Sequence, residues 1–383
     1  MKVLFATIPG YGHTYPLMPL ATACADAGHE VTVATGAPFL GRLPLPTVAG
    51  IPAGTELDAV IDETRRRHPD RHGNELSFAM FADTTAELVS GTLDAVLDGQ
   101  RPDLIVYEAL NVGAGIAADV RDIPAVGFAI LLAPFVVDTI HTAARQFHAE
   151  YWAGHGRAVP PGRGPLAGAV IDPTPPSLLL AEQPPEPVRR LPIRSVAYAE
   201  NSVAAPEWLT GRRSRPAVYL TLGTVAFGAV EVIRRAVDQI ATLDVDLLVA
   251  VGPEGNPDAL GPVPENVHVE LFVSQARVLQ AVDLIVHHGG TGTVLGAAAA
   301  GLPQLILPQG ADHFVNADLI AAAGAGRGLL NDAQVGGAIT DAVRALLGQC
   351  PERARAARLH EEIAAMPAPA AVVPELERLA AGG

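Results

Sequence analysis

A pair of histidines followed by a glycine-rich turn is the part of this sequence with the most specific chemistry. The apolar run Val282–Val286 ends at His287 and His288, and an alanine-rich segment follows the turn. This order predicts a strand, a turn and a helix. Glycines let a ligand approach bare backbone, and a helix N-terminus presents unpaired N–H groups and a positive dipole end. The pattern predicts a phosphate site with an imidazole donor, and a turn with two packing histidines is the alternative. The small residues of the turn are Gly289, Gly290, Thr291, Gly292 and Thr293.

A further histidine stands in a similar turn near the N-terminus. The strand predicted over Lys2–Thr7 is followed by Gly10-Tyr11-Gly12-His13-Thr14-Tyr15. A nicotinamide fingerprint is disfavoured, because it needs a small residue at the position of Tyr15 and an acid after the second strand, Glu30–Ala34. The glycines instead clear space for an acceptor molecule. A histidine at a helix N-terminus stays neutral and can act as a base, and a packing histidine is the alternative for His13.

A carboxylate is expected on the same side of the predicted sheet as His13. Glu108 directly follows the strand predicted over Asp103–Tyr107, so it lies at a carboxyl end. There it would hold the imidazole N–H, fix its tautomer and stabilise the imidazolium that forms. The alternative is a solvated carboxylate at the end of a strand.

Two strands of the second half are also followed by polar residues. Thr224, after the strand Ala217–Leu222, offers a hydroxyl and an N–H to a phosphate. Asp312 and His313 follow the strand Gln304–Pro308. We expect Asp312 to accept two sugar hydroxyls and His313 to donate to the sugar, with a helix cap as the alternative for His313.

One acidic pair is excluded as a metal site. Asp244 and Asp246 have the Asp-x-Asp spacing, but they precede a strand instead of following it. We interpret them as solvated charge, and no metal or cofactor is expected.

Composition limits the classes of protein to which these sites can belong. A chain of 383 residues is longer than one core supports, and 49% apolar with 17% charged residues suits buried parallel strands. The net charge of −15 argues against nucleic acid and membrane partners. Cys24 and Cys350 are too few for a disulfide framework or a zinc site. The longest apolar stretch, Val126–Val137, contains Pro134 and is shorter than the roughly 20 residues of a membrane span, and no signal peptide is evident, so a cytoplasmic protein is predicted.

The alternation of strand-like and helix-like segments predicts an α/β fold with a doubly wound parallel sheet in each half. A helix is expected over Tyr15–Ala27, and a short strand over Ser177–Leu180 within an otherwise irregular segment. The expected organisation is an N-terminal domain over residues 1–200, a linker over 201–216, a C-terminal domain over 217–365, and a helix over 366–383 that crosses back to the first domain.

Taken together, these residues resemble the GT-B glycosyltransferases of antibiotic and natural-product biosynthesis, which are related to the plant small-molecule glucosyltransferases. The resemblance implies two Rossmann-like domains that face each other across a crevice, with the acceptor on the first and a nucleotide sugar on the second. Residues 175–180 look most like actinobacterial enzymes that decorate enediynes and other polyketides. The likeness covers essentially the whole chain and rests on the segments 9–16, 221–224, 287–293, 303–316 and 366–369.

The resemblance also implies roles for single residues in an inverting, metal-independent sugar transfer to a small-molecule aglycone. His13 matches the catalytic base and Glu108 the acid that orients it. His287 matches the imidazole on the donor diphosphate, Gly289–Thr293 match the backbone cradle, and Thr224 matches a second phosphate contact.

The remaining matches concern the nucleobase, the sugar and the acceptor. Phe272 and Val273 stand where the family holds the base. A thymidine diphosphate sugar is the expected donor, and the choice between thymine and uracil stays open. Asp312-His313 replaces the commoner Asp-Gln pair at the sugar. The expected partners are the nucleotide sugar and the aglycone, and the oligomeric state is open between a monomer and a homodimer. The residues expected to contact the acceptor are Tyr11, Gly12 and Phe81.

Two other functions fit the same fold. A nucleotide-sugar epimerase would need several acids around the sugar, whereas Asp312 alone dominates the predicted site. A non-catalytic partner that activates another glycosyltransferase would be marked by loss of the base, whereas His13 and Glu108 are both present.

Overall fold

The computed structural model describes residues 1–162, 165–180, 188–199, 204–211, 213–223, 230–253 and 255–382. The chain forms two compact units. Unit 1 comprises residues 1–173, 181–194 and 367–383, and unit 2 comprises residues 174–180 and 195–366. Within the described residues, no helix combines the length and the apolar character that crossing a membrane requires.

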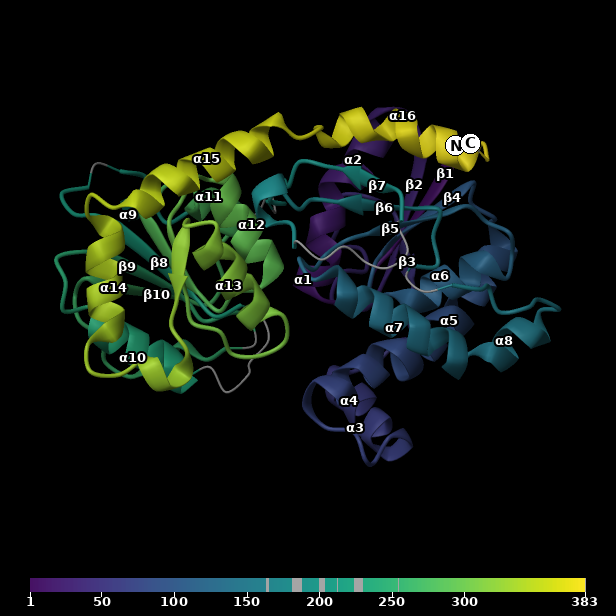
Figure 1. The fold of residues 1–383 in the computed structure, drawn as a ribbon, viewed down its shortest axis with the longest axis horizontal. Helices are drawn as coiled ribbons and strands as arrows, with labels where there is room; N and C mark the ends of the chain where they lie inside the picture. The colour runs from purple at the N-terminus through teal and green to yellow at the C-terminus, as the bar shows by residue number, and fades with distance from the viewer. Residues whose placement is uncertain are drawn as a thin grey trace. The chain divides into compact units, whose positions relative to one another are not determined.

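Unit 1 is built on a seven-stranded parallel sheet with strand order β3-β2-β1-β4-β5-β6-β7 (Figure 1). The interior strand β1 is buried over Val3–Ala6, as expected for a strand covered on both faces. The strands are β1 (Lys2–Ala6), β2 (Glu30–Thr35), β3 (Thr47–Ala49), β4 (Leu104–Glu108), β5 (Ala125–Phe128), β6 (Ala169–Asp172) and β7 (Arg190–Pro192).

The helices of unit 1 include the end of the chain. The last helix, α16, packs on α2, and Glu377 of α16 lies 3.1 Å from Nε2 of His29, which follows α2. A π-helix, η2, separates α4 from α5. The helices are α1 (Tyr11–Thr14), η1 (Tyr15–Leu17), α2 (Met18–Asp26), α3 (Leu57–Arg67), α4 (Gly73–Ala79), η2 (Met80–Thr85), α5 (Ala86–Gly99), α6 (Val112–Asp119), α7 (Pro134–Phe147), α8 (Ala149–Gly154) and α16 (Pro369–Ala380).

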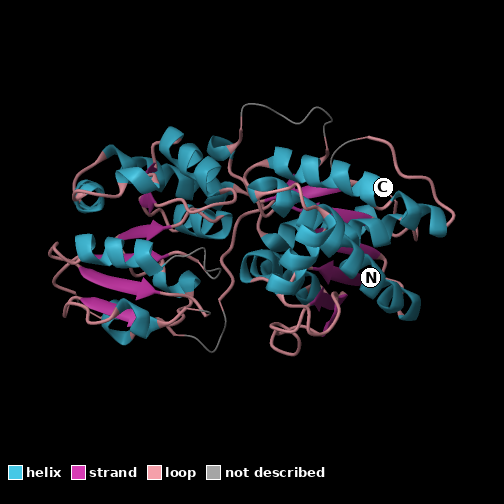
Figure 2. Cartoon of the chain, turned by 90° about the horizontal axis from the view of Figure 1, so that it is seen from below, coloured by secondary structure: helices cyan, strands magenta, loops and turns pink. Residues whose placement is uncertain are grey.

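Unit 2 contains a six-stranded parallel sheet with strand order β10-β9-β8-β11-β12-β13. Figure 2 shows the strands of each unit lying between helices. The strands are β8 (Ala217–Thr221), β9 (Asp246–Ala250), β10 (Val267–Glu270), β11 (Leu284–His287), β12 (Gln304–Ile306) and β13 (Gly326–Gly328). The helices are η3 (Pro176–Leu178), α9 (Glu207–Thr210), α10 (Val230–Ile240), η4 (Pro257–Leu260), α11 (Gln275–Val278), α12 (Thr291–Ala299), α13 (His313–Ala322), η5 (Asn331–Ala333), α14 (Ala338–Leu347) and α15 (Pro351–Ala365).

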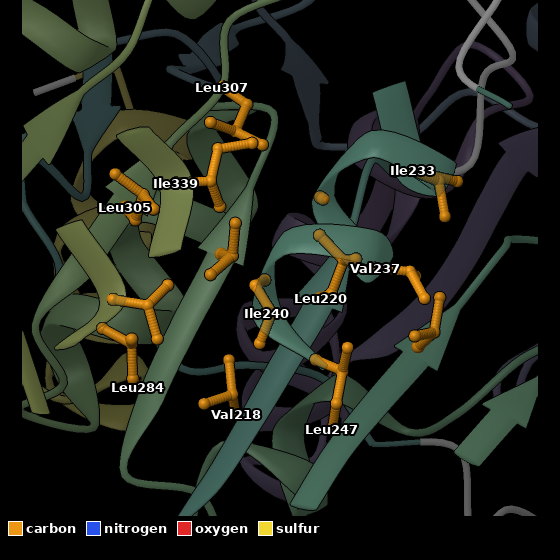
Figure 3. Packing of buried hydrophobic residues seen from close by; sticks show 14 of the residues in the cluster. Val218, Leu220, Ile233, Val237, Ile240, Leu247, Leu284, Leu305, Leu307 and Ile339 are labelled. Atoms are coloured by element: carbon orange, nitrogen blue, oxygen red, sulfur yellow. The ribbon is translucent and has the colours of Figure 1, made fainter. Parts of the chain in front are cut away.

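The two faces of the unit 2 sheet bury separate cores. Leu284 and Val286 of β11 join one cluster with residues of α10 and α14, part of which Figure 3 shows. Ile285 of the same strand joins a second cluster, with Val278 of α11. Successive side chains of a strand point to opposite faces, so the apolar run that ends at His287 is used by both cores.

The structure corrects several sequence predictions. The first helical segment begins at Tyr11 instead of Tyr15, since α1, η1 and α2 follow one another without a break. The predicted strand Ser177–Leu180 is wrong, because Pro176–Leu178 forms a 3₁₀ turn after consecutive prolines. The irregular middle segment contributes the strands β6 and β7. The segment predicted as a linker includes α9, whose Leu209 is 2% exposed in a core of unit 2.

Candidate active site

His13 and Glu108 meet in unit 1 because their strands are neighbours. β1 pairs with β4 in parallel register, with Ala6 opposite Tyr107. The turn after β1 carries His13, and Glu108 is the last residue of β4. Carboxyl ends of neighbouring parallel strands share one edge of the sheet, which brings His13 Nδ1 to 3.0 Å from Glu108 Oε1.

The environment of this pair fixes which imidazole nitrogen carries the proton. Glu108 is fully buried, and its Oε2 accepts from the backbone N–H of Leu110 at 2.8 Å. A carboxylate acts only as an acceptor, so the proton at the His13–Glu108 contact is assigned to Nδ1. The side chain of His13 is 24% exposed, and its Nε2 is left with a lone pair. The arrangement can take up a proton at Nε2 and stabilise the resulting cation through Glu108.

Aromatic side chains surround the turn that carries His13. The ring of Tyr11 packs edge-on against Tyr15 and Phe39, with centroids 5.1 and 5.2 Å away. The ring of Phe81, in η2, lies 5.9 Å from the imidazole of His13. Gly12 is exposed. The three residues predicted to contact the acceptor, Tyr11, Gly12 and Phe81, therefore lie on or beside the His13 turn.

The glycine turn of unit 2 is closed by tight backbone packing. Gly289 has a φ of +103°, and a Cβ there would stand 2.8 Å from Ile306 Cγ2. A Cβ at Gly290 would collide with the ring of His288. α12 begins directly after the turn at Thr291, and its nine residues leave the N–H groups of the first turn without carbonyl partners of their own helix. Gly292 is exposed at this helix end, as expected for an anion site.

His287 does not face this helix end. It is the last residue of β11 and is fully buried. Its Nδ1 accepts from the N–H of Gly289 at 3.1 Å, and its Nε2 bonds to Gln304 Oε1 at 3.0 Å. Burial lowers the pKa of the imidazole to about 3, so His287 is neutral. Both ring nitrogens are used within the protein, and the ring links the glycine turn to β12.

His288 is the second imidazole at the turn and directly follows β11. The residue is partly exposed, but its Nδ1 is buried and has no hydrogen-bond partner within the described part of the chain. The ring lies against Gly223 at the end of β8, where a Cβ would stand 2.8 Å from its Cε1. Burial and the neighbouring His313 and His287 lower the pKa of His288 well below its usual value. β11 runs one residue further than predicted, so the first residue past the strand is His288.

One carboxylate oxygen of Asp312 accepts hydrogen bonds from two residues of unit 2. Its Oδ2 accepts from Thr291 Oγ1 and from Asn316 Nδ2, each at 2.7 Å. Asn316 is fully buried, and its Nδ2 also lies 2.8 Å from the carbonyl of Gly289. Oδ2 thus receives two hydrogen bonds inside the protein, and Oδ1 is the oxygen available to a ligand. The expectation that both oxygens of Asp312 take sugar hydroxyls is not supported by this geometry.

The contacts of His313 fit a structural role, which the sequence left open as the alternative to sugar binding. It is 4% exposed, and its Nδ1 lies 3.3 and 3.2 Å from the backbone N–H groups of Gln309 and Gly310. Its ring packs edge-on against His288 at 4.6 Å. The side chain closes the turn before α13 and supports His288.

The remaining predicted site residues of unit 2 are those for the nucleobase and two threonines for the phosphates. Phe272 is partly buried, and the side chain of Val273 packs into a core, which leaves its backbone for a ligand. The hydroxyl of Thr293 bonds to Gln275 at 3.2 Å. Thr224 lies outside the described residues.

The described residues hold no cluster of three or more histidine, cysteine or acidic side chains placed for a metal ion. Asp246 is paired with Arg215 at 2.6 Å, and Asp244 lies 3.8 Å from the same arginine. The side chain of Asp244 is 88% exposed, which fits the interpretation as solvated charge, whereas that of Asp246 is only 13% exposed.

The fold consists of two parallel-sheet units of Rossmann type, and unit 2 has a glycine turn at the N-terminus of α12. These are the features of a GT-B glycosyltransferase. Family models support this class: residues 22–223 match the N-terminal domain of the Erythromycin biosynthesis protein CIII-like family, and residues 234–379 match its C-terminal domain. The chain belongs to this family of natural-product glycosyltransferases.

Individual relatives match over nearly the whole chain. The L-demethylnoviosyl transferase of Streptomyces niveus is 33% identical, covering 97% of this chain and 96% of the relative. The TDP-daunosamine transferase DnrS of Streptomyces peucetius is 29% identical, covering 100% of this chain and 97% of the relative. The crystal structure of the Streptomyces sp. SF2575 glycosyltransferase SsfS6 with thymidine diphosphate has a TM-score of 0.81 and 26% identity, covering 99% of each chain.

Proposed function

We propose that this protein is an inverting, metal-independent glycosyltransferase that moves a deoxysugar from a thymidine diphosphate donor to a small-molecule aglycone. The observation that carries the proposal is the His13–Glu108 pair, with its 3.0 Å contact, its buried carboxylate and its partly exposed imidazole. Such a pair suits the removal of a proton from a hydroxyl acceptor. It also argues against a non-catalytic partner protein, which has no use for a base.

In the proposed reaction, the acceptor hydroxyl gives its proton to Nε2 of His13 as its oxygen attacks the anomeric carbon. The bond from that carbon to the diphosphate oxygen breaks on the opposite face, so the anomeric configuration inverts. The carboxylate of Glu108 stabilises the imidazolium that forms on His13. The products are the glycoside and thymidine diphosphate, and the proton then passes from His13 to solvent.

Unit 2 is proposed to bind the donor. The N-terminus of α12, with the backbone of the glycine turn, would take the charge that develops on the leaving diphosphate. His288, whose buried Nδ1 has no hydrogen-bond partner among the described residues, would contact the diphosphate in the role that the sequence assigned to His287. Oδ1 of Asp312 would accept a sugar hydroxyl, and Phe272 with the backbone of Val273 would hold the base.

The names of the relatives support the donor that is proposed. One relative transfers a demethylnoviosyl group, another is named for TDP-daunosamine, and a structural neighbour was crystallised with thymidine diphosphate. The diphosphate charge would be taken by protein dipoles and an imidazole, which is why no metal is proposed.

Replacement of His13 by alanine tests the proposal. Turnover with an alcohol acceptor is expected to fall by about a hundredfold or more, because proton transfer by a positioned group contributes that much. Calorimetric binding of thymidine diphosphate serves as the control and should be unchanged. Near-normal turnover by His13→Ala would contradict the proposed base. The anomeric configuration of the product, read by NMR, tests inversion separately.

A further inference from the structure

One buried histidine of unit 1 is connected to Glu108 through a single peptide group. His141 lies on α7 and is fully buried. Its Nε2 is 2.8 Å from the carbonyl oxygen of Ala109, the residue that follows Glu108. The N–H of Leu110 belongs to the same peptide plane as that carbonyl, and it donates to Glu108 Oε2 at 2.8 Å.

The other nitrogen of His141 determines the direction of these hydrogen bonds. Nδ1 lies 3.1 Å from the backbone N–H of Leu166, which can only donate. The ring proton is therefore on Nε2 and is donated to Ala109. Burial lowers the pKa of His141 to about 4, so the imidazole is neutral and keeps this tautomer near neutral pH.

The contacts form a continuous chain of donors and acceptors. His141 donates to the Ala109 carbonyl, the Leu110 N–H donates to Glu108, and His13 donates to the other oxygen of Glu108. A peptide group is planar, so fixing its carbonyl also fixes its N–H. Hydrogen bonds in such a series polarise and strengthen one another.

We propose that His141 is a positioning residue for sugar transfer, because it orients the peptide that orients Glu108 and thereby His13. The inference rests on the proposed function, in which His13 is the base. His141 touches none of the reacting groups. Its contribution is that the Glu108 carboxylate stays aligned with Nδ1 of His13 while the imidazole becomes charged.

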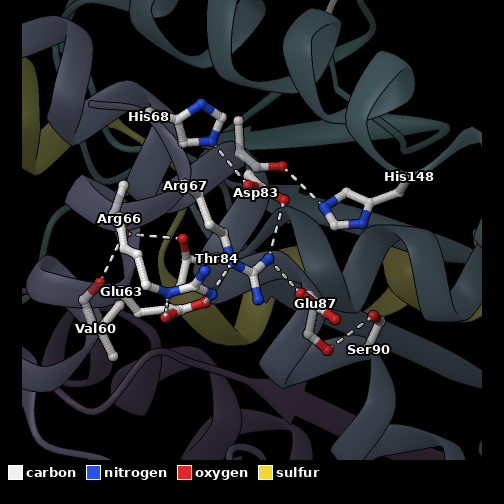
Figure 4. Close-up of polar contacts among 12 residues, drawn as sticks. Val60, Glu63, Arg66, Arg67, His68, Asp83, Thr84, Glu87, Ser90 and His148 are labelled. Atoms are coloured by element: carbon white, nitrogen blue, oxygen red, sulfur yellow. Dashed lines mark hydrogen bonds and ion pairs between the residues drawn. The ribbon is translucent and has the colours of Figure 1, made fainter. Parts of the chain in front are cut away.

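α7 is followed by a matched histidine that serves as a control. His148, seven residues after His141, is 7% exposed, and its Nε2 lies 3.0 Å from the carbonyl of Ala82 in the π-helix η2. Figure 4 shows His148 within the polar network of Asp83, His68 and Arg67. It therefore makes the same kind of buried contact, but to a peptide that does not touch Glu108.

Two conservative substitutions separate the contacts of His141. The amide of His141→Gln reaches the position of Nε2, so it keeps the bond to Ala109 and loses the one to Leu166. The shorter His141→Asn keeps an acceptor near the position of Nδ1 and loses the bond to Ala109. Each variant loses one hydrogen bond, so their unfolding temperatures, measured by calorimetry, are expected to fall alike.

Kinetics of these variants test the inference. We expect His141→Asn to lower kcat about tenfold with KM for the acceptor nearly unchanged, and His141→Gln to stay within about twofold of the native kcat. His148→Leu is expected to lower the unfolding temperature while kcat at saturating acceptor is retained. Equal losses of kcat in His141→Asn and His141→Gln, or a loss of the same size in His148→Leu, would show that His141 is merely structural.

A double variant distinguishes failure of the inference from failure of the proposed function. Residues that act through one another are strongly non-additive. If His141 acts through His13, adding His141→Asn to His13→Ala should lower kcat by less than twofold further. A full additional tenfold loss overturns the inference while the base assignment stands. A His13→Ala variant with native turnover overturns the base assignment itself.

Discussion

Each unit contains a parallel strand followed by a glycine-containing turn and a helix, with histidine nearby. The environments of these histidines differ between the two units. In unit 1 the imidazole of His13 is partly exposed and paired with a buried carboxylate. In unit 2 the imidazoles of His287, His288 and His313 are grouped together, and burial lowers the pKa of each. The first environment favours a histidine that accepts a proton. The second favours histidines that stay neutral and pack against the glycine turn.

The difference shows that a histidine beside a glycine turn does not define a function by itself. The role depends on the partner of the second ring nitrogen. For His13 that partner is Glu108, which stabilises a cation. For His287 the two partners are Gln304 and the N–H of Gly289, which fix a neutral ring in place.

The largest effect on turnover is expected from removing the negative charge of Glu108 in unit 1. Glu108→Gln keeps the shape of the side chain but replaces the carboxylate by an amide. We expect kcat to fall by about a hundredfold or more, because the imidazolium loses its counter-charge and the imidazole its tautomer. Steady-state kinetics with an alcohol acceptor measure this, with thymidine diphosphate affinity as the control. Turnover within threefold of the native value would remove the distinction between the two units.

Acid should destabilise the protein through the neutral histidines. The pKa of His287 is about 3 in the folded chain and near 6.5 in an unfolded one, so unfolded chains bind the proton first. Its contribution to stability is complete above pH 6.5 and is lost as the pH falls from 6.5 toward 3. Between pH 7 and pH 5 this amounts to about 2 kcal/mol. Chemical denaturation at both pH values should show a smaller difference for His287→Gln than for the native protein. The same pH difference in both proteins would contradict the neutral assignment.

Replacing His287 or His288 of unit 2 should affect different properties, the unfolding temperature in one case and the diphosphate affinity in the other. His288→Ala is expected to weaken thymidine diphosphate binding about tenfold, as loss of one hydrogen bond to a charged group does. His287→Ala should instead lower the unfolding temperature and leave the affinity within about threefold. Isothermal calorimetry and thermal unfolding of both variants decide the matter. The reverse pattern would assign the diphosphate to His287.

A smaller effect is expected from the hydroxyl of Thr291, which bonds to Asp312 in the structure. Thr291→Val keeps the shape and removes this donor. KM for the nucleotide sugar is expected to rise about threefold to tenfold, because Asp312 loses one of the two donors that orient it. The dissociation constant of thymidine diphosphate, which has no sugar, should not change. Equal losses for both ligands would mean that the hydroxyl serves the diphosphate.

The smallest effect is expected from a chelator. Dipoles of the α12 N-terminus and an imidazole are proposed to stabilise the leaving diphosphate, so EDTA should leave the rate unchanged. Rates with and without EDTA, and with added magnesium or manganese, are the measurement. Loss of activity in EDTA that magnesium restores would show that unit 2 binds the diphosphate through a metal ion.

Much of the fold, and one pair of site residues, could be predicted from the order of residues along the chain. Alternating apolar segments predicted two parallel sheets, and the family and structural comparisons bear out that fold class. The position of Glu108 directly after a strand predicted its meeting with His13, because neighbouring parallel strands end at one edge. The order of the glycine turns carried the resemblance to natural-product glycosyltransferases. Each of these inferences depends on spacing along the chain, which a sequence states directly.

Tertiary structure alone decided which polar atoms remain available to a ligand. β11 extends one residue further than predicted, so His287 is a buried strand residue and His288 is the first residue past the strand. Asn316 lies 27 residues from Gly289 and His141 lies 32 residues from Ala109, yet both bond to those carbonyls. Such partners are set by how helices pack on a sheet. The sequence shows which residues can form hydrogen bonds, whereas packing decides which of those bonds are already made.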